Sequence, residues 1–256
     1  LSLRRQRQMC IRDSLNAALA RALRDKNNAV ALASVKSLQE IAGDANFKAG
    51  DTQSIIDAMQ YGDRRVRFEA AFSVAQALPQ SPFNGQELVV PLLAEAISQT
   101  GQPSVLAVMP TQEAVNAMVE PLKAQGFMVT GATDASGAMS ASAALPAIDV
   151  VMISDDVAPA EIETLLGLLA QSPKTRAAGK LFLVKSNASQ WETRKNADTT
   201  ISTTTNSDPS ALKDTITAAR TASGALPVDP ELATQYATRA GELIKRLAVS
   251  RGQVLD

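Results

Sequence analysis

Histidine is absent from this chain of 256 residues, and cysteine occurs only once. A chain without histidine lacks the side chain that most often serves as a general base or as a metal ligand. A single cysteine excludes a disulfide framework and any zinc site built from several cysteines. The sequence therefore offers few of the side chains on which nucleophilic or metal-dependent catalysis usually depends.

Long apolar runs and an excess of one charge are absent as well. No run of about 18 apolar residues occurs, so no transmembrane helix is predicted. The formal net charge is −1, from 25 basic and 26 acidic residues, which argues against a protein that binds nucleic acid by neutralising phosphates. With 45% hydrophobic but only 4% aromatic residues, the chain is expected to fold around aliphatic and small side chains, as stacked helices do.

The first fourteen residues differ from everything that follows. The segment 1–14, LSLRRQRQMCIRDS, contains four arginines and the single cysteine, and it shows no helical period. Residues 4–14 resemble the translation of a transposase-type sequencing adapter over eleven consecutive positions. We therefore expect 1–14 to be an artefact that is disordered and packs against nothing; the alternatives are a basic targeting arm and a nucleic-acid-binding arm. The last residues, RGQVLD, stop inside a helical pattern, so the chain is expected to be a fragment of a longer protein.

Two segments, 15–43 and 51–79, match one another at a spacing of 36 residues. Each is predicted to form a helix, a short polar turn and a second helix, which ends at Gly43 in the first copy and at Pro79 in the second. Such a repeat favours stacked helix pairs. The matched positions are Leu19 and Ile55, Leu23 and Met59, Val30 and Val66, Ser34 and Ala70, Leu38 and Val74, and, in the linkers, Phe47 and Phe83.

The second copy resembles a HEAT repeat at the residues that define such a repeat. These are Asp63 in the turn, Arg67 one turn later and the small residues 70–71. The resemblance implies an α-solenoid in which Asp63 and Arg67 form a ladder between neighbouring repeats. The first copy has Asn27 and Ala31 at the corresponding positions, so the ladder cannot run through it.

A third first helix is predicted at 86–98, and its apolar face must be buried against a partner. No second helix follows it directly. The long amphipathic helix at 226–252 is expected to return to the repeats and to supply that partner. The stretch between them is therefore interpreted as an insertion.

From residue 103 the pattern changes to short apolar strands that alternate with amphipathic helices. Such alternation predicts a parallel sheet with helices on both faces. The polar stretch before the last strand is expected to be irregular, with Trp191 either capping the sheet or lying exposed as a contact residue. Strands are expected at 103–109, 127–132, 148–154, 179–186 and 199–203, and helices at 111–126, 135–147, 159–172 and 208–223.

The five-fold strand and helix order, the central strand IDVVMIS (148–154) and the segment 196–212 resemble the receiver domain of two-component signalling proteins. The resemblance implies a flavodoxin-like, five-stranded parallel sheet. The expected fold is therefore α/β plus all-α. HEAT-like α-solenoid repeats are expected at 15–100, a receiver-like domain at 101–224 and a returning helix in 225–256.

A working receiver domain needs two carboxylates after its first strand to hold Mg²⁺, and a lysine after its fifth strand to hold the phosphoryl group. In this chain Met109 and Pro110 follow the first strand, and the lysine position falls at 204–206, which contains no lysine. Without the carboxylates that Mg²⁺ prefers, the charge of a phosphate is uncompensated. We therefore predict no catalytic, cofactor or metal site.

The phosphoacceptor region is degenerate in this resemblance. Ser154 falls on the acceptor position at the end of the third strand, and a shift of one residue would place Asp155 there, with Asp156 beside it. Ser186 falls on the hydroxyl position after the fourth strand. The alternative interpretation is that both aspartates are solvated loop carboxylates.

Other polar residues have simpler interpretations. Lys180 and Lys185 are expected at the exposed ends of a strand. The three arginines Arg64, Arg65 and Arg67 could bind an acidic partner, but a solvated turn with one ladder arginine is the favoured interpretation. No GxxxxGK[ST] or GxGxxG phosphate-binding loop occurs.

These patterns favour a non-enzymatic scaffold for protein–protein interactions, because stacked repeats present an extended surface. The expected partners are proteins, with no nucleic acid and no membrane span. Two alternatives remain open. One is a phosphorylation-responsive two-component-type regulator in which Asp155 accepts phosphate, and the other is the regulatory part of a larger enzyme.

Overall fold

The computed structural model of the chain divides into two compact units. The helical unit comprises Leu1–Gly101 and Leu226–Asp256, and the α/β unit comprises Gln102–Ala225. In sequence, the α/β unit is therefore inserted into the helical unit. The residues that the structure describes are 3–42, 53–186, 188–250 and 253–255.

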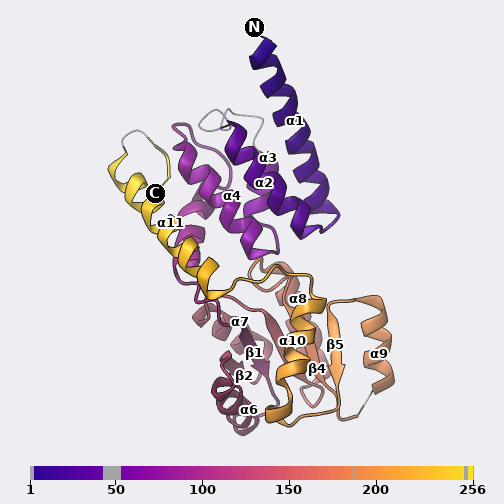
Figure 1. The fold of residues 1–256 in the computed structure, drawn as a ribbon. Coiled ribbons are helices and arrows are strands. Elements are labelled where there is room, and N and C mark those ends of the chain that lie inside the picture. Colours follow the sequence, from indigo (N-terminus) through magenta and orange to yellow (C-terminus); the bar gives the residue numbers. More distant parts are fainter. Residues whose placement is uncertain (1–2, 43–52, 187, 251–252, 256) are drawn as a thin grey trace. The chain divides into compact units, whose positions relative to one another are not determined.

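The helical unit is made of helix pairs that pack side by side (Figure 1). Its helices are α1 (Leu3–Arg24), α2 (Asn28–Ala42), α3 (Gln53–Met59), α4 (Arg64–Ala77), the 3-10 turn η2 (Gln86–Leu88), α5 (Val89–Ile97) and α11 (Pro230–Val249). The pairs are α1 with α2, α3 with α4, and α5 with α11. Between pairs, α1 contacts α3, α2 contacts α4, and α4 contacts both α5 and α11.

One hydrophobic core joins these pairs. On α11 the buried residues recur every three or four positions, which places them on one face. The ring of Tyr236 on that face meets the rings of Phe68 and Phe72, with centroids 5.7 and 5.6 Å apart. The apolar face of α5, which includes Leu92 and Leu93, is buried in the same core. The amphipathic pattern of α5 and α11 is thus explained by their packing on each other and on α4.

The spacing of 36 residues has a structural counterpart, because α2 begins at residue 28 and α4 at residue 64. Most of the described matched positions are buried, but Val30 is 45% exposed whereas Val66 is fully buried. The two helices also differ in their packing: α4 packs against α5, whereas among the described residues α2 makes no comparable contact with α3. Pro79 follows the end of α4, while Gly43 and Phe47 lie outside the described residues.

Helix α1 begins at Leu3, which differs from the expected disorder of the first fourteen residues. The segment 3–14 contains neither proline nor glycine and is rich in arginine and glutamine, which are good helix formers. The helix that starts in the repeat can therefore continue towards the N-terminus. Cys10 is exposed and Ile11 is 49% exposed. The adapter origin of this segment stays a prediction.

The α/β unit contains a five-stranded sheet in which every strand pair is parallel. The strand order is β2-β1-β3-β4-β5, which is the order of flavodoxin-like folds. The expected α/β fold with a five-stranded parallel sheet is therefore confirmed. The strands are β1 (Ser104–Val108), β2 (Met128–Ala132), β3 (Val150–Ser154), β4 (Gly179–Leu183) and β5 (Ile201–Thr204).

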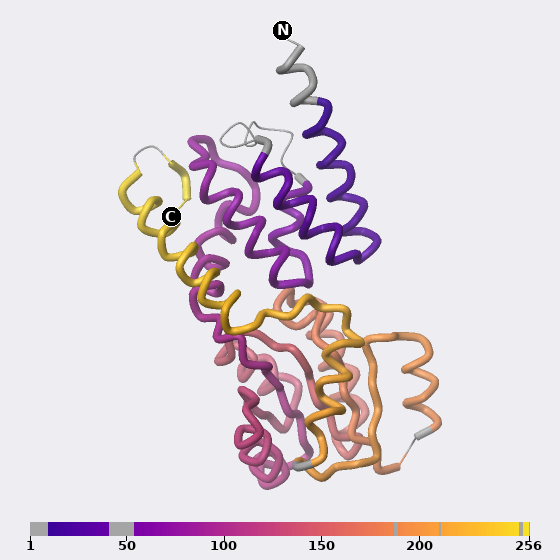
Figure 2. The backbone as a smooth tube through the Cα atoms, viewed as in Figure 1, coloured from indigo at the N-terminus to yellow at the C-terminus, as the bar shows by residue number. Residues whose placement is uncertain are grey.

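Helices cover both faces of this sheet, and each face has its own core. The helices are α6 (Gln112–Ala124), α7 (Ala135–Ala144), α8 (Pro159–Gln171), α9 (Ala188–Ala197), the 3-10 turn η3 (Pro209–Ala211) and α10 (Lys213–Ala222). Residues of α7, α8 and α9 share one core, and residues of α6 and α10 share the other. Figure 2 follows the chain from α5 into β1 and from α10 on into α11.

Two elements differ from the sequence-based expectation. Helix α9 occupies the polar stretch that was expected to be irregular. Its one large apolar residue, Trp191, is 5% exposed and stacks on Phe182 of β4 with ring centroids 3.9 Å apart. This single anchor explains why the stretch is helical although its sequence has no apolar stripe. The last predicted helix is divided into η3 and α10.

The chain leaves the helical unit at Gly101 and returns at Leu226. Gly101 has a φ of +75°, and a Cβ atom there would lie 2.3 Å from the backbone nitrogen of Pro230. Both residues belong to the helical unit, so its two boundary segments touch each other. Asp229, just before Pro230, caps α11 by accepting a hydrogen bond from the backbone of Leu232. Among the described residues, no helix is both long and apolar enough to cross a membrane.

Candidate functional site

The carboxyl edge of the sheet is the first candidate, because ligands of open parallel sheets bind outside the carboxyl ends of the strands. Strands β3 and β4 are neighbours, with Ser154 paired to Leu183. The loops that follow them carry Asp155 and Asp156 on one side and Lys185 and Ser186 on the other. The structure thus brings together the four sequence-predicted residues of the phosphoacceptor region.

The Asp155 carboxylate is occupied by the loop that follows β4. Both of its oxygens accept from the backbone N–H of Lys185, at 3.0 Å each. Oδ2 also accepts from the backbone N–H of Ser186 at 3.0 Å and from its hydroxyl at 3.4 Å. The carboxylate therefore stabilises the protein's own loop, and an incoming phosphate or metal ion would have to displace these donors.

Ser154 and Asp156 stand on either side of this carboxylate in sequence but have different surroundings. Ser154 ends β3, is 3% exposed, and accepts a hydrogen bond from the Asp156 backbone at 3.3 Å. The Asp156 carboxylate accepts from the Lys185 ammonium at 2.5 Å. That hydrogen bond, the charge of Asp156 and, less strongly, the charge of Asp155 raise the pKa of Lys185. Both side chains of this ion pair are exposed, so it contributes little to stability.

The positions that would complete a receiver site carry other side chains. Met109 follows β1, is buried, and donates its backbone N–H to Ala132. Pro110 is exposed, and the residues after β5 are Thr205 and Asn206. In the parts of the chain that the structure describes, no group of three or more histidine, cysteine, aspartate or glutamate side chains could hold a metal ion.

A hollow of about 300 Å³ lies at the ends of β4 and β5, beside α9. Two of its lining residues pair with each other, because the Thr203 hydroxyl donates to the Glu192 carboxylate at 3.0 Å. Small-molecule sites are usually lined by apolar and aromatic side chains, whereas this hollow has one apolar residue in its lining. Its lining consists of Val184, Glu192, Thr203, Thr204 and Thr205.

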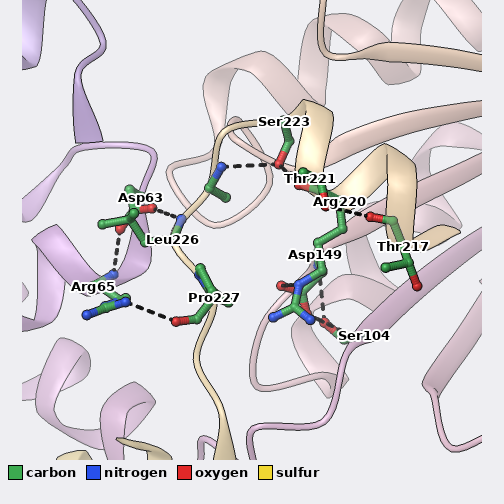
Figure 3. Close-up of polar contacts among 11 residues, drawn as sticks. Asp63, Arg65, Ser104, Asp149, Thr217, Arg220, Thr221, Ser223, Leu226 and Pro227 are labelled. Carbon is green, nitrogen blue, oxygen red and sulfur yellow. Dashed lines mark hydrogen bonds and ion pairs between the residues drawn. The ribbon is translucent and has the colours of Figure 1, made fainter. Parts of the chain in front are cut away.

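A buried carboxylate also stands at the amino edge of the sheet (Figure 3). Asp149 is 6% exposed and accepts from the Ser104 backbone at 2.9 Å and from its hydroxyl at 3.1 Å. Arg220 of α10 lies on its other oxygen, with Nε 3.4 Å away. This cluster joins the starts of β1 and β3 to α10, so its role is structural.

Asp63 plays a similar part in the helical unit (Figure 3). Its Oδ1 accepts from the backbone of Arg65 and Val66 and so caps α4. Its Oδ2 accepts from the backbone N–H of Leu226 at 2.7 Å, and Arg65 donates to the Pro227 carbonyl at 3.2 Å. The start of α4 therefore holds the segment that leads into α11.

Arg67 has a different partner from the one that the HEAT resemblance implies. Its Nη2 pairs with Glu95 of α5 at 2.9 Å, and its Nη1 donates to the carbonyls of Tyr61 and Gly62. The ion pair that joins this helix pair to the next is thus made by Glu95 on α5, which is the first helix of the next pair. Asp63 caps its own helix and holds the returning segment.

Sequence reasoning did not single out Glu69, which joins three helices. Its side chain is 3% exposed, although it is charged. It pairs with Arg239 of α11 at 2.7 Å and with Lys36 of α2 at 3.5 Å. The Arg239 guanidinium also lies over the Phe72 ring, 4.6 Å from its centroid. Glu69 could have been recognised in the sequence, because it is a glutamate inside the apolar run of a helix that is expected to be buried.

Both tyrosines of the chain lie near such carboxylates. Burial, and then the charge of Asp63, raise the pKa of Tyr61 to about 12. Burial, and then the charge of Glu69, raise the pKa of Tyr236 to about 12. The Tyr61 hydroxyl donates to Asn28 at 2.7 Å and so ties α2 to the turn before α4.

Comparison of the chain with protein-family models, with curated proteins and with solved structures gives no match.

Proposed function

We propose that the chain is a non-enzymatic scaffold for protein–protein interactions, built from HEAT-like helix pairs with an inserted, degenerate receiver-like unit. The observation that carries the proposal is the stacking of α2, α4 and α11. In each pair the second helix contacts the second helix of its neighbour. Repeat proteins bind other proteins on surfaces that stacked helices form. Helix α4 is buried from Val66 to Ala75, so the exposed positions of this stack come mainly from α2 and α11.

The carboxyl edge of the α/β unit supports the non-enzymatic part of the proposal. The carboxylate nearest to the acceptor position, Asp155, accepts hydrogen bonds from the loop after β4. The neighbouring cation, Lys185, is paired with Asp156. These groups satisfy one another, so the unit has the arrangement of a structural or docking domain.

Selection of peptides from a random displayed library, with the full chain as target, tests the scaffold. Peptides that bind the second helices should lose affinity for the Ala33→Arg variant, because Ala33 is exposed on α2. The matched control is Ala20→Arg, at an exposed alanine of the first helix α1, which should bind as the parent chain does. Failure to select any binder, or binders that ignore every second-helix variant, would reject the scaffold.

A phosphorylation-responsive regulator is the second candidate, because Asp155, Lys185 and Ser186 do meet at one edge of the sheet. It requires the Asp155 carboxylate to give up its backbone donors. Intact-mass measurement after incubation with acetyl phosphate and Mg²⁺ separates the two candidates. The scaffold predicts an unchanged mass, and the regulator predicts a phosphate adduct that the Asp155→Asn variant does not form.

A further inference from the structure

Helices α2, α4 and α11 run side by side in the same direction. Contacts between them join residues in rising order along both helices, as parallel neighbours require. The pairs are Lys36–Glu69 and Gln39–Gln76 for α2 with α4, and Arg65–Pro227 and Glu69–Arg239 for α4 with the segment that contains α11. We give the name Lys36–Arg239 surface to the partly exposed side chains of Lys36 and Arg239, together with the buried Glu69 and Phe72 that they contact.

This surface has more cations than anions within reach of a partner. Among the described residues, Glu69 is the carboxylate that pairs with both Lys36 and Arg239, and its side chain is only 3% exposed. The side chains of Lys36 and Arg239 are 47% and 34% exposed. A partner would therefore meet two cationic groups, while the carboxylate that they share lies beneath them.

Arg239 is held in a conformation that leaves donors for a partner. Among the described residues, Arg239 makes one hydrogen bond, from Nη1 to Glu69. The N–H groups of Nε and Nη2 therefore remain available as donors. The guanidinium is also fixed over the Phe72 ring. A guanidinium fork matches a carboxylate in two places, and a side chain that is already ordered loses less entropy on binding.

Further charged side chains lie before and after this surface along the helices. Arg65 lies one turn before Glu69 on α4 and adds a partly exposed cation on the N-terminal side. Glu40 and Glu242 are exposed about one turn after Lys36 and Arg239, and the exposed Lys245 and Arg246 follow one turn later on α11. Nucleic acid, which carries negative charge along its whole length, would meet repulsion from Glu40 and Glu242.

We propose that the Lys36–Arg239 surface binds a short acidic segment of a partner protein, with its carboxylates on Arg239 and Lys36. This inference rests on the proposed scaffold function and names the chemistry of its partner. The carboxylates of the segment would complete the pairing that Glu69 supplies only in part.

Fluorescence anisotropy with the full chain and a labelled dodecapeptide of alternating aspartate and serine tests the proposal. Lys36→Glu should weaken binding about fivefold. Glu69→Gln should tighten it about threefold, because the competing carboxylate is removed while the side chain keeps its shape. A purely structural role for Glu69 would not tighten binding. Arg239→Lys keeps the charge but loses the planar fork, so it should weaken binding less than Lys36→Glu does.

Lys123→Glu is the matched control. Lys123 lies on α6 and is 49% exposed, close to the 47% of Lys36, but its partner Glu120 is exposed whereas Glu69 is buried. The control should bind the peptide as the parent chain does. Equal weakening by Lys36→Glu and Lys123→Glu would overturn the proposal, because it would indicate general charge attraction.

Two further probes separate the remaining outcomes. A lysine–serine peptide of the same length should not bind, and a single-stranded oligonucleotide should bind more weakly than the acidic peptide. Tighter binding of either probe overturns the proposal. If library peptides bind the second helices but the acidic peptide does not bind, this inference alone is rejected. If neither the library peptides nor the acidic peptide bind, the scaffold is rejected as well.

Discussion

Asp63 and Asp155 each use a carboxylate to hold a segment that is not their immediate neighbour in sequence. Asp63 caps α4 and accepts from Leu226, 163 residues away. Asp155 accepts from the loop after β4, about 30 residues away. A carboxylate that accepts several backbone donors fixes the geometry of a loop, because each donor would be costly to leave unpaired. At the residue scale, these two acidic side chains therefore have a structural role.

Removal of the Asp155 carboxylate should release the loop after β4. We expect Asp155→Ala to lower the free energy of unfolding by about 1–3 kcal/mol, since hydrogen bonds to a charged group are lost. Amide hydrogen exchange should become faster at Lys185 and Ser186. The control Asp156→Ala removes only an exposed ion pair and should leave both amides protected. Unchanged exchange in Asp155→Ala would show that the loop is held by other contacts.

The tyrosines should give a clear alkaline signature. Both have a pKa raised from 10.0 to about 12, and burial is the main cause. Because the folded-state pKa lies above the unfolded value, their contribution to stability is complete below about pH 10 and is lost as the pH rises towards 12. Absorbance titration of the folded chain should show no tyrosinate at pH 10. The unfolded chain, with its tyrosines near pKa 10, is the reference, and a folded-state midpoint near pH 10 would contradict the burial of these hydroxyls.

At the scale of elements, α5 depends on α11 for its apolar partner. The buried face of α5 contributes Leu93, which is fully buried, whereas Ile97 at the end of the same helix is 43% exposed. We expect Leu93→Ala to lower the free energy of unfolding by about 2–5 kcal/mol, since it leaves a cavity in the core. Ile97→Ala should change it by less than about 0.5 kcal/mol. Denaturant unfolding measures both values, and equal effects would show that α5 is not packed in this way.

A substitution at Gly101 tests the contact between the two boundary segments of the helical unit. Gly101 and Gly126 both have a positive φ, but a Cβ at Gly126 would meet nothing within 4 Å. Gly126→Ala should therefore cost only about 1–2 kcal/mol for the left-handed backbone. Gly101→Ala adds a clash with the backbone of Pro230 and should cost at least about 1 kcal/mol more. Thermal unfolding of the two variants gives the comparison, and equal losses would contradict the close approach.

The elements that could be predicted from sequence are those with a strong hydrophobic pattern. Strands β1 and β3 are buried at all five positions, so they appear as continuous apolar runs. Helix α9 could not be predicted, because one tryptophan provides its anchor and periodicity needs several residues. Helix α1 extends into residues 3–14 because helix propensity continues where the apolar period ends.

The candidate sites were harder to predict than the elements. The positions of Asp155 and Ser186 at one edge followed from the expected strand order. The pair of Lys185 with Asp156 did not, because it depends on the conformation of two loops. Glu69 and Arg239 are 170 residues apart, and only the return of α11 places them together.

At the scale of the whole chain, the change from helical repeats to alternating strands and helices is what made the α/β fold predictable. The insertion also explains why contacts within the helical unit span the entire α/β unit in sequence, as the bonds of Asp63 and Arg65 to residues 226–227 do. Partner binding would then be a property of the helical unit, with the α/β unit as a second folded body on the same chain.

Photo-cross-linking of a library-selected peptide to the full chain tests the scaffold most directly. The peptide carries a photoreactive group, and mass spectrometry locates the cross-linked residues. We predict cross-links on exposed positions of α2 and α11 and at Gln76 of α4, with none at the loop after β4, and their loss in the Ala33→Arg variant. Cross-links confined to the carboxyl edge of the sheet, or to α1 and α3, would contradict the account.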